Sequence, residues 1–231
     1  MSEFIQISDL SRRDAIRRIA LALTAAGAGA SGLLDIASAQ HVHKEVKSSK
    51  GAAGDYTPKL LTEHEFQTVS KLAELIVPAD ERSGSAVDAG APEFIDLLCS
   101  QNETLARIYT SGIGWLDARM RHRYDSTFLE ASGEQQTEML DLLVEAQRNA
   151  KEPDALWDRD YARFHDYGME KRSELGAGVR FFDWVRKMSV DAYYTSEIGI
   201  KDLGYIGNEA LSEFVVPQEA IDHAMKAAPQ V

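Results

Sequence analysis

The sequence predicts an all-α protein: a single helical domain with an irregular C-terminal tail, preceded by a signal peptide and a linker. Apolar residues recur at helical spacing through most of the body, and typical helix-start residues precede several of these stripes. No run of alternating β-branched residues predicts a strand. The composition, 44% hydrophobic and 27% charged, is that of an ordinary globular domain. The expected boundaries are 1–39 for the signal peptide, 40–57 for a polar linker and 58–231 for the helical domain with its tail.

The first 39 residues have the three-part layout of a twin-arginine signal peptide. Arg12 and Arg13 open a basic stretch, and an apolar run follows over residues 19–34. Ala37 and Ala39 are small residues at the spacing that a signal peptidase recognises. The apolar run has 16 residues, whereas a membrane-spanning helix needs roughly 20. We therefore expect cleavage after Ala39, and export of the folded protein to the periplasm.

The stretch Gly27–Gly32 satisfies the glycine pattern GxGxxG of dinucleotide-binding proteins. That pattern binds a pyrophosphate only between a strand and a helix of a βαβ unit. Here a polar stretch rich in Lys, Ser and Gly follows, which is typical of a linker. The match therefore reflects the Gly/Ala-rich composition of the signal peptide.

The first body helix has the clearest start of all. Thr62 and Glu65 have the spacing of a capping box, and Leu61 and Phe66 that of a hydrophobic staple. Pro78 ends this helix, because the residue before a proline disfavours helical angles. The expected elements that follow, in chain order, are a second helix that starts at Pro92, a third over 103–123, a fourth after a Ser132–Gln135 capping box, a helix with irregular ends over 157–168, a helix over 177–194, and an extended tail over 195–231.

Charge and cysteine content exclude several kinds of function. The net charge of −12 argues against binding nucleic acid, and against docking on anionic lipid by charge alone. The single cysteine, Cys99, permits no intramolecular disulfide, Cys-based zinc ribbon, iron–sulfur cluster or covalent haem within this chain. His41 and His43 could bind a transition metal only weakly, since two ligands on a linker do not make a site. No catalytic motif is recognised, so we expect no catalytic, cofactor-binding or metal-binding residue in this chain.

Several stretches, in this order, resemble the gluconate 2-dehydrogenase subunit 3 family. They are the twin-arginine segment, Leu72–Asp80, Ala89–Asp96, Phe181–Phe182, Tyr193–Ser196, Gly199 and Gly204–Gly207. The similarity covers roughly residues 61–217. The resemblance implies a non-catalytic small subunit, with no redox centre of its own and no activity alone. Such a subunit pairs with a flavin-bearing subunit of the glucose–methanol–choline type, often with a cytochrome c subunit as well.

In such complexes FAD lies in the catalytic partner and haem c in the third subunit. The complexes oxidise sugars, sugar acids or polyols in the periplasm, and contact the membrane only through partners. The small subunit carries the export signal for the catalytic one. The alternative is a stand-alone periplasmic binding or scaffold protein. The sequence does not name the substrate, whose pocket would lie in the partner.

Two long stretches lack a helical stripe of their own, residues 78–92 and 193–217, and we expect the partner contact there. Tyr194, Tyr205 and Phe214 are the candidate interface residues, because aromatic side chains are enriched at interface cores. These rings could instead pack back on their own helices. The basic end of the third helix, Arg119–Arg123, is the next candidate, although cations there also favour the helix dipole.

Overall fold

The computed structural model describes residues 36–51, 54–150, 174–205, 216 and 218–227, and within these ranges every regular element is a helix. The all-α prediction is confirmed. The helices in chain order are α2 (Ile36–Ser49), α3 (Glu63–Ile76), α4 (Ala91–Gln101), α5 (Glu103–Tyr124), α6 (Gly133–Ala150), α8 (Gly176–Tyr194), α9 (Glu197–Asp202) and α10 (Gln218–Ala227). None of these described helices is long and apolar enough to cross a bilayer.

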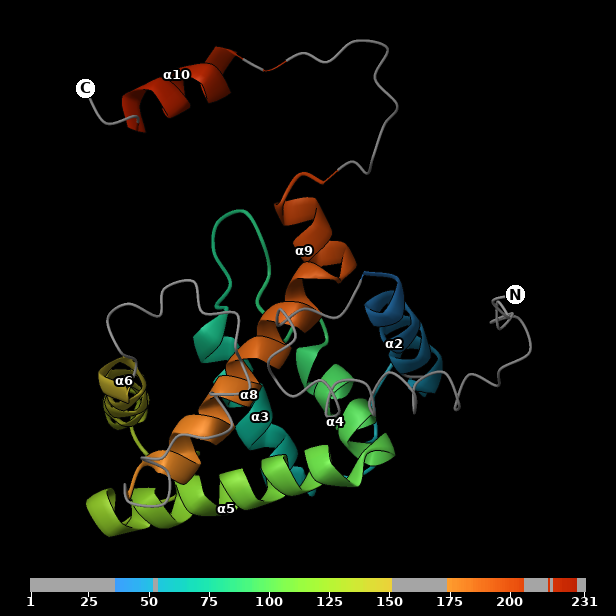
Figure 1. Cartoon of the computed structure of the whole chain (residues 1–231). Helices are drawn as coiled ribbons and strands as arrows, with labels where there is room; N and C mark the ends of the chain where they lie inside the picture. Colours follow the sequence, from blue (N-terminus) through green and yellow to red (C-terminus); the bar gives the residue numbers. More distant parts are fainter. Residues whose placement is uncertain (1–35, 52–53, 151–173, 206–215, 217, 228–231) are drawn as a thin grey trace, which may run out of the picture.

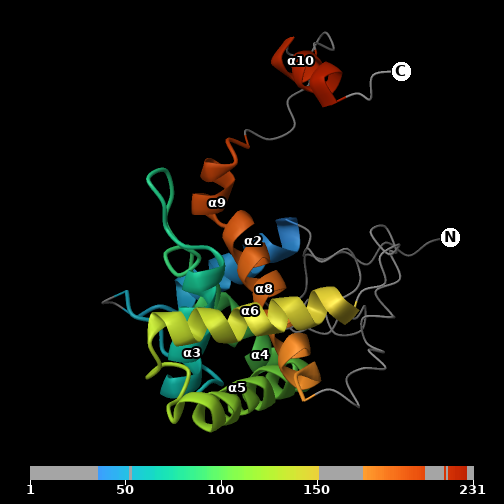
Figure 2. The same cartoon turned by 90° about the vertical axis from the view of Figure 1, so that its left-hand side faces the viewer.

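Helix α8 is the central element of the body (Figure 1). It packs against α2, α3, α4, α5, α6 and α9, and most of its residues are buried. Figure 2 shows α6 crossing the outside of the bundle, while α10 lies apart from the body in both views. The largest fully buried side chains come mainly from α3, α4 and α5: Leu72, Phe94, Ile95, Leu98, Leu105, Tyr109, Ile113, Leu116 and Met120, joined by Phe128 and Met139.

The local start signals of the sequence appear in the structure. The hydroxyl of Thr62 accepts a hydrogen bond from the Glu65 amide, and the Glu65 carboxylate accepts one from the Thr62 amide, which completes the predicted capping box of α3. Helix α4 has a proline in its first turn. Ser132 and Gln135 form the second predicted capping box, ahead of α6. Helices α3 and α6 therefore begin where a side chain satisfies a free amide of the first turn, whereas the proline of α4 has no amide to satisfy.

Replacing Thr62 by alanine should lower the free energy of unfolding by about 1 kcal/mol. The substitution removes the oxygen that accepts from the Glu65 amide and leaves the first turn of α3 without its side-chain cap. Denaturant unfolding would measure this change. Thr62→Ser keeps the hydroxyl and should remain close to wild type; an equal loss in both variants would mean that the cap is not the cause.

A buried carboxylate fixes the segment that leads into α3. Asp96 of α4 is fully buried and accepts hydrogen bonds from the amides of Lys59, Leu60 and Leu61 at 2.7–3.1 Å. It also accepts one from the hydroxyl of Tyr56 at 2.8 Å. A buried carboxylate is tolerated when donors surround it, so this one residue holds residues 56–61 against the body.

The structure differs from the sequence prediction at both ends of the domain. Residues 40–49, expected to be linker, belong to α2, whose side chains Ala39, Val42 and Val46 are buried. The stripe is short and lies among lysines and serines, and packing on α4 and α8 compensates for its weak intrinsic preference. The tail, expected to be extended, contains α9 and α10. The helix expected over 157–168 lies outside the described residues.

Candidate partner-binding face

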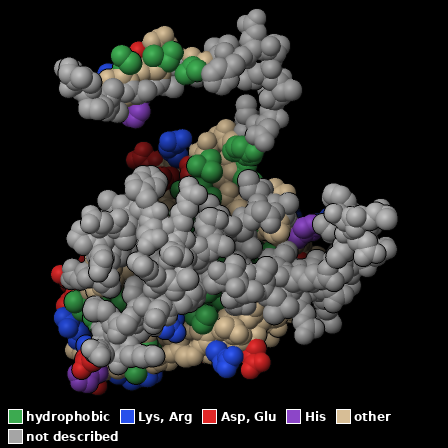
Figure 3. Space-filling view, viewed as in Figure 1, with side chains coloured by type: hydrophobic (Ala, Val, Ile, Leu, Met, Phe, Trp, Pro, Cys, Tyr) green, Lys and Arg blue, Asp and Glu red, His purple; other side chains and the backbone are tan. Residues whose placement is uncertain are grey.

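Exposed apolar side chains gather where α8 ends and α9 projects from the body. Tyr194, Leu203 and Tyr205 are 37%, 61% and 48% exposed. Figure 3 shows apolar side chains at the end of α9, beside charged side chains of the α3–α4 loop. We call this surface the apical face, made of residues 194–205 together with loop residues 78–90. Clustered apolar side chains with a charged rim are typical of an interaction surface.

The helical backbone is interrupted between α8 and α9, and local residues fix this break. The Ser196 hydroxyl accepts from the Gly199 amide at 3.1 Å and donates to the Tyr193 carbonyl at 2.7 Å. A Cβ at position 199 would strike the Tyr193 carbonyl, so only glycine fits there. Helix α9 therefore leaves α8 in one defined direction.

Helix α9 ends in a Schellman motif. Gly204 has a left-handed φ of 63°, the Gly204 amide donates to the Lys201 carbonyl, and the Tyr205 amide donates to the Ile200 carbonyl. The motif fixes the backbone on both sides of Gly204, and with it the positions of Leu203 and Tyr205. Covering these side chains would therefore require little additional ordering of the backbone.

The buried Tyr193 ties the α3–α4 loop to α9. Its hydroxyl lies 2.6 Å from the Ser83 hydroxyl and 3.5 Å from the Asp202 carboxylate. Asp80 accepts from the amides of Arg82 and Ser83, each at 2.8 Å, and these hydrogen bonds lower the pKa of its carboxyl. The loop tip therefore stays ionised and lies beside the apolar end of α9. The loop and the segment after α8 were both predicted from the sequence as contact regions. The hydrogen bonds of Tyr193 place them next to each other.

The model of the family described as gluconate 2-dehydrogenase subunit 3 matches residues 63–212. The chain belongs to this family. The match begins at the first residue of α3 and extends beyond α9, so it includes the whole apical face. The family description names one subunit of a larger enzyme, which implies partner subunits. Comparisons with curated proteins and with solved structures find no match.

Two of the three predicted interface residues of this gluconate 2-dehydrogenase subunit 3 member are exposed in the structure. Tyr194 and Tyr205 both lie on the apical face, whereas Phe214, like Arg12 and Arg13, falls outside the described residues. Sequence reasoning missed Leu203, the most exposed apolar side chain of this face. It also missed Ile221 and Met225, exposed on α10, whose spacing of four could have revealed a helical stripe.

The basic end of α5 is partly neutralised. Arg119 pairs with Glu174 at 3.0 Å, and Arg123 pairs with Glu138. This end lies beside α6, away from α9 (Figure 1). The cluster therefore fits the interpretation of a solvated, dipole-stabilising helix end.

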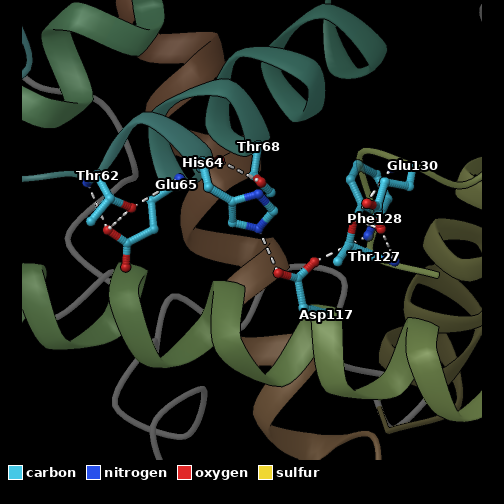
Figure 4. Close-up of polar contacts among 8 residues, drawn as sticks. All are labelled: Thr62, His64, Glu65, Thr68, Asp117, Thr127, Phe128 and Glu130. Atoms are coloured by element: carbon cyan, nitrogen blue, oxygen red, sulfur yellow. Dashed lines mark hydrogen bonds and ion pairs between the residues drawn. The ribbon is translucent and has the colours of Figure 1, made fainter.

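His64 and Asp117 form a close pair of titratable groups that links three elements of the described body. His64 Nε2 lies 2.6 Å from one Asp117 oxygen, and the other oxygen accepts from the Phe128 amide at 3.0 Å (Figure 4). The hydroxyls drawn nearby have other partners: Thr62 and Thr127 donate to glutamates, and Thr68 donates to the His64 carbonyl. The pair therefore joins α3, α5 and the turn before α6, and presents no activated nucleophile.

A groove of about 640 Å³ lies between α2, α9 and residues 88–90. His43 is half-buried there, 3.0 Å from the Thr195 hydroxyl, and burial lowers its pKa. Two lysines of the groove, Lys47 and Lys50, already pair with Glu197 and Glu93. No group of three or more potential metal ligands occurs among the described residues. Polar residues that line the groove therefore pair with one another and hold α2 next to the end of α8 and the start of α9.

The remaining candidate for chemistry, Cys99, lies in the core of α4. It is 2% exposed, and burial raises the pKa of its thiol well above the usual value. A neutral, enclosed thiol is a poor nucleophile and does not reach a partner chain. Cys99 therefore acts as a small apolar side chain.

Proposed function

We propose that this chain is a non-catalytic accessory subunit that binds a flavin-bearing dehydrogenase subunit of the glucose–methanol–choline type through its apical face. An exposed apolar surface whose backbone is fixed by local hydrogen bonds, in a member of a family of enzyme subunits, supports this proposal. The catalytic partner supplies FAD, and a cytochrome c subunit with haem c accepts its electrons. The complex oxidises sugars, sugar acids or polyols in the periplasm, and the small subunit stabilises its partner.

Purification through a tag on this chain, from cells that produce it naturally, tests the pairing. We expect a second polypeptide with flavin absorbance to elute with the tagged chain at a constant ratio. The isolated chain should be colourless and should not reduce an artificial electron acceptor with any sugar. A chain that elutes alone under gentle conditions would instead support the stand-alone scaffold protein.

The second part of the proposal is that the N-terminal segment exports both subunits by the twin-arginine route. The sequence supports it through the paired Arg12 and Arg13 ahead of an apolar run, and this route accepts cargo that is already folded. The apical face lies on residues distinct from the export segment, so the two roles need not compete.

Replacing Arg12 and Arg13 together by lysine should leave both subunits in the cytoplasm and abolish periplasmic flavin. The charge of the segment is unchanged, so only recognition of the paired arginines is tested. Arg17→Lys is the matched control and should be exported normally. Periplasmic accumulation of the double variant at the wild-type level would refute this route.

A further inference from the structure

The small residues expected to guide a signal peptidase lie inside a packed helix. Ala37 and Ala39 are in the first turn of α2. Ala39 and Val42 are fully buried and Val46 is 5% exposed. Their spacing of three and four places them on one face, and α2 packs against α4 and α8.

Specific contacts hold α2 at several points along its length. The His43 ring lies with its centroid 4.9 Å from that of Phe94 on α4. The same imidazole hydrogen-bonds Thr195 at the end of α8. Lys50, just past the helix, pairs with Glu93 at 3.1 Å. Helix α2 is therefore integrated into the body.

A peptidase needs the chain on both sides of the scissile bond in an extended form, so that main-chain groups can pair with the enzyme. A helical bond next to a buried residue reaches this form only after local unfolding. Here unfolding must expose Ala39 and disrupt the packing of Val42 and Val46. Proteins exported by the twin-arginine route are already folded, so α2 is packed before the peptidase acts.

We propose that the bond between Ala39 and Gln40 stays intact in the folded protein, and that α2 is a permanent part of the subunit. The exported chain then retains residues N-terminal to Gln40, and any processing occurs before Ile36. This replaces the cleavage after Ala39 expected from the sequence. The order of folding and cleavage rests on the proposed export route, whereas the protection itself depends only on the packing of α2.

Incubation of the purified full-length chain with purified signal peptidase in detergent tests the protection. Mass spectrometry would follow the fragment that begins at Gln40. A synthetic peptide of residues 30–50 should be cut at least tenfold faster than the folded chain. Equal rates would overturn the proposal. A peptide that resists cleavage would assign the protection to the sequence and would equally overturn the role of packing.

Two matched variants separate packing from charge. Val42→Asp places a carboxylate on the buried face of α2 and should bring cleavage after Ala39 close to the rate of the peptide. Lys44→Asp places the same side chain on the exposed face and should remain protected. Amide hydrogen exchange would report whether α2 has opened. If α2 opens in Val42→Asp without increased cleavage, the proposal fails.

The intact mass of the exported protein completes the test. We expect a chain that begins before Ile36. An N-terminus at Gln40 in cells would overturn the proposal. If that N-terminus is found in cells although the folded chain resists cleavage in vitro, the chain must be cleaved before it folds. That combination would refute export of the folded protein by the twin-arginine route, and not the protection of the bond by packing.

Discussion

Replacing Gly112 by alanine should lower the free energy of unfolding by about 1–3 kcal/mol. Helix propensity alone would favour alanine by about 1 kcal/mol, so the packing penalty must exceed this gain. An added Cβ would overlap Cβ, Cγ and Cδ2 of Phe181 on α8. Phe181 is 2% exposed, and its ring packs edge-on against Tyr109 at 5.9 Å. The atoms in the way lie close to the backbone and have no free space into which to move.

A second glycine makes the equivalent contact with the roles of the two helices exchanged. A Cβ on Gly178 of α8 would overlap the ring of Trp115 on α5. The two glycines let α5 and α8 approach closely, and each receives an aromatic side chain from the other helix. Disturbing one of them should therefore separate α5 from the central helix.

Gly114 provides a matched control on α5. No atom lies within 4 Å of a Cβ built there, so Gly114→Ala should raise the free energy of unfolding by about 0.5–1 kcal/mol. Chemical denaturation with an unchanged m-value would measure both changes. Stabilisation by both substitutions would contradict the close packing of α5 on α8.

A double substitution on the apical face, Leu203→Asp with Tyr205→Asp, should weaken binding of the flavoprotein at least about tenfold, equivalent to 1.4 kcal/mol. The side chains of Leu203 and Tyr205 are 61% and 48% exposed, so the free subunit should keep most of its stability. A buried carboxylate facing an apolar partner would be unpaired and costly. The ratio of flavin to tagged chain after purification measures the loss, and titration of the separated subunits gives the change in Kd.

Leu60→Asp is the control for this substitution. Leu60 is 40% exposed and precedes α3, at the opposite end of that helix from the α3–α4 loop. This variant should bind the flavoprotein like the wild type. If the Leu203/Tyr205 variant also binds normally, the apical face is not the interface, and the exposed Ile221 and Met225 of α10 become the next residues to substitute.

The sequence alone predicted the helical class and the starts of the main body helices. Thr62 with Glu65, Pro92, and Ser132 with Gln135 act within one turn of chain, so their effect can be read from neighbouring residues. The family resemblance was likewise present in short ordered motifs, and the match over residues 63–212 confirms it. Tyr194 and Tyr205 were predicted as interface candidates because they lie in segments without a helical stripe, and binding experiments will test that prediction.

Tertiary structure decided the features whose partners lie far away in the chain. Helix α2 has too short a stripe to be recognised as a helix, and it packs because α4 and α8 offer a surface for Ala39, Val42 and Val46. Asp96 is explained only by amides more than thirty residues earlier. Gly112 cannot be distinguished from Gly114 by sequence, since only one of them faces Phe181. Local hydrogen bonds are determined by residues a few positions apart, whereas burial depends on which distant surfaces meet.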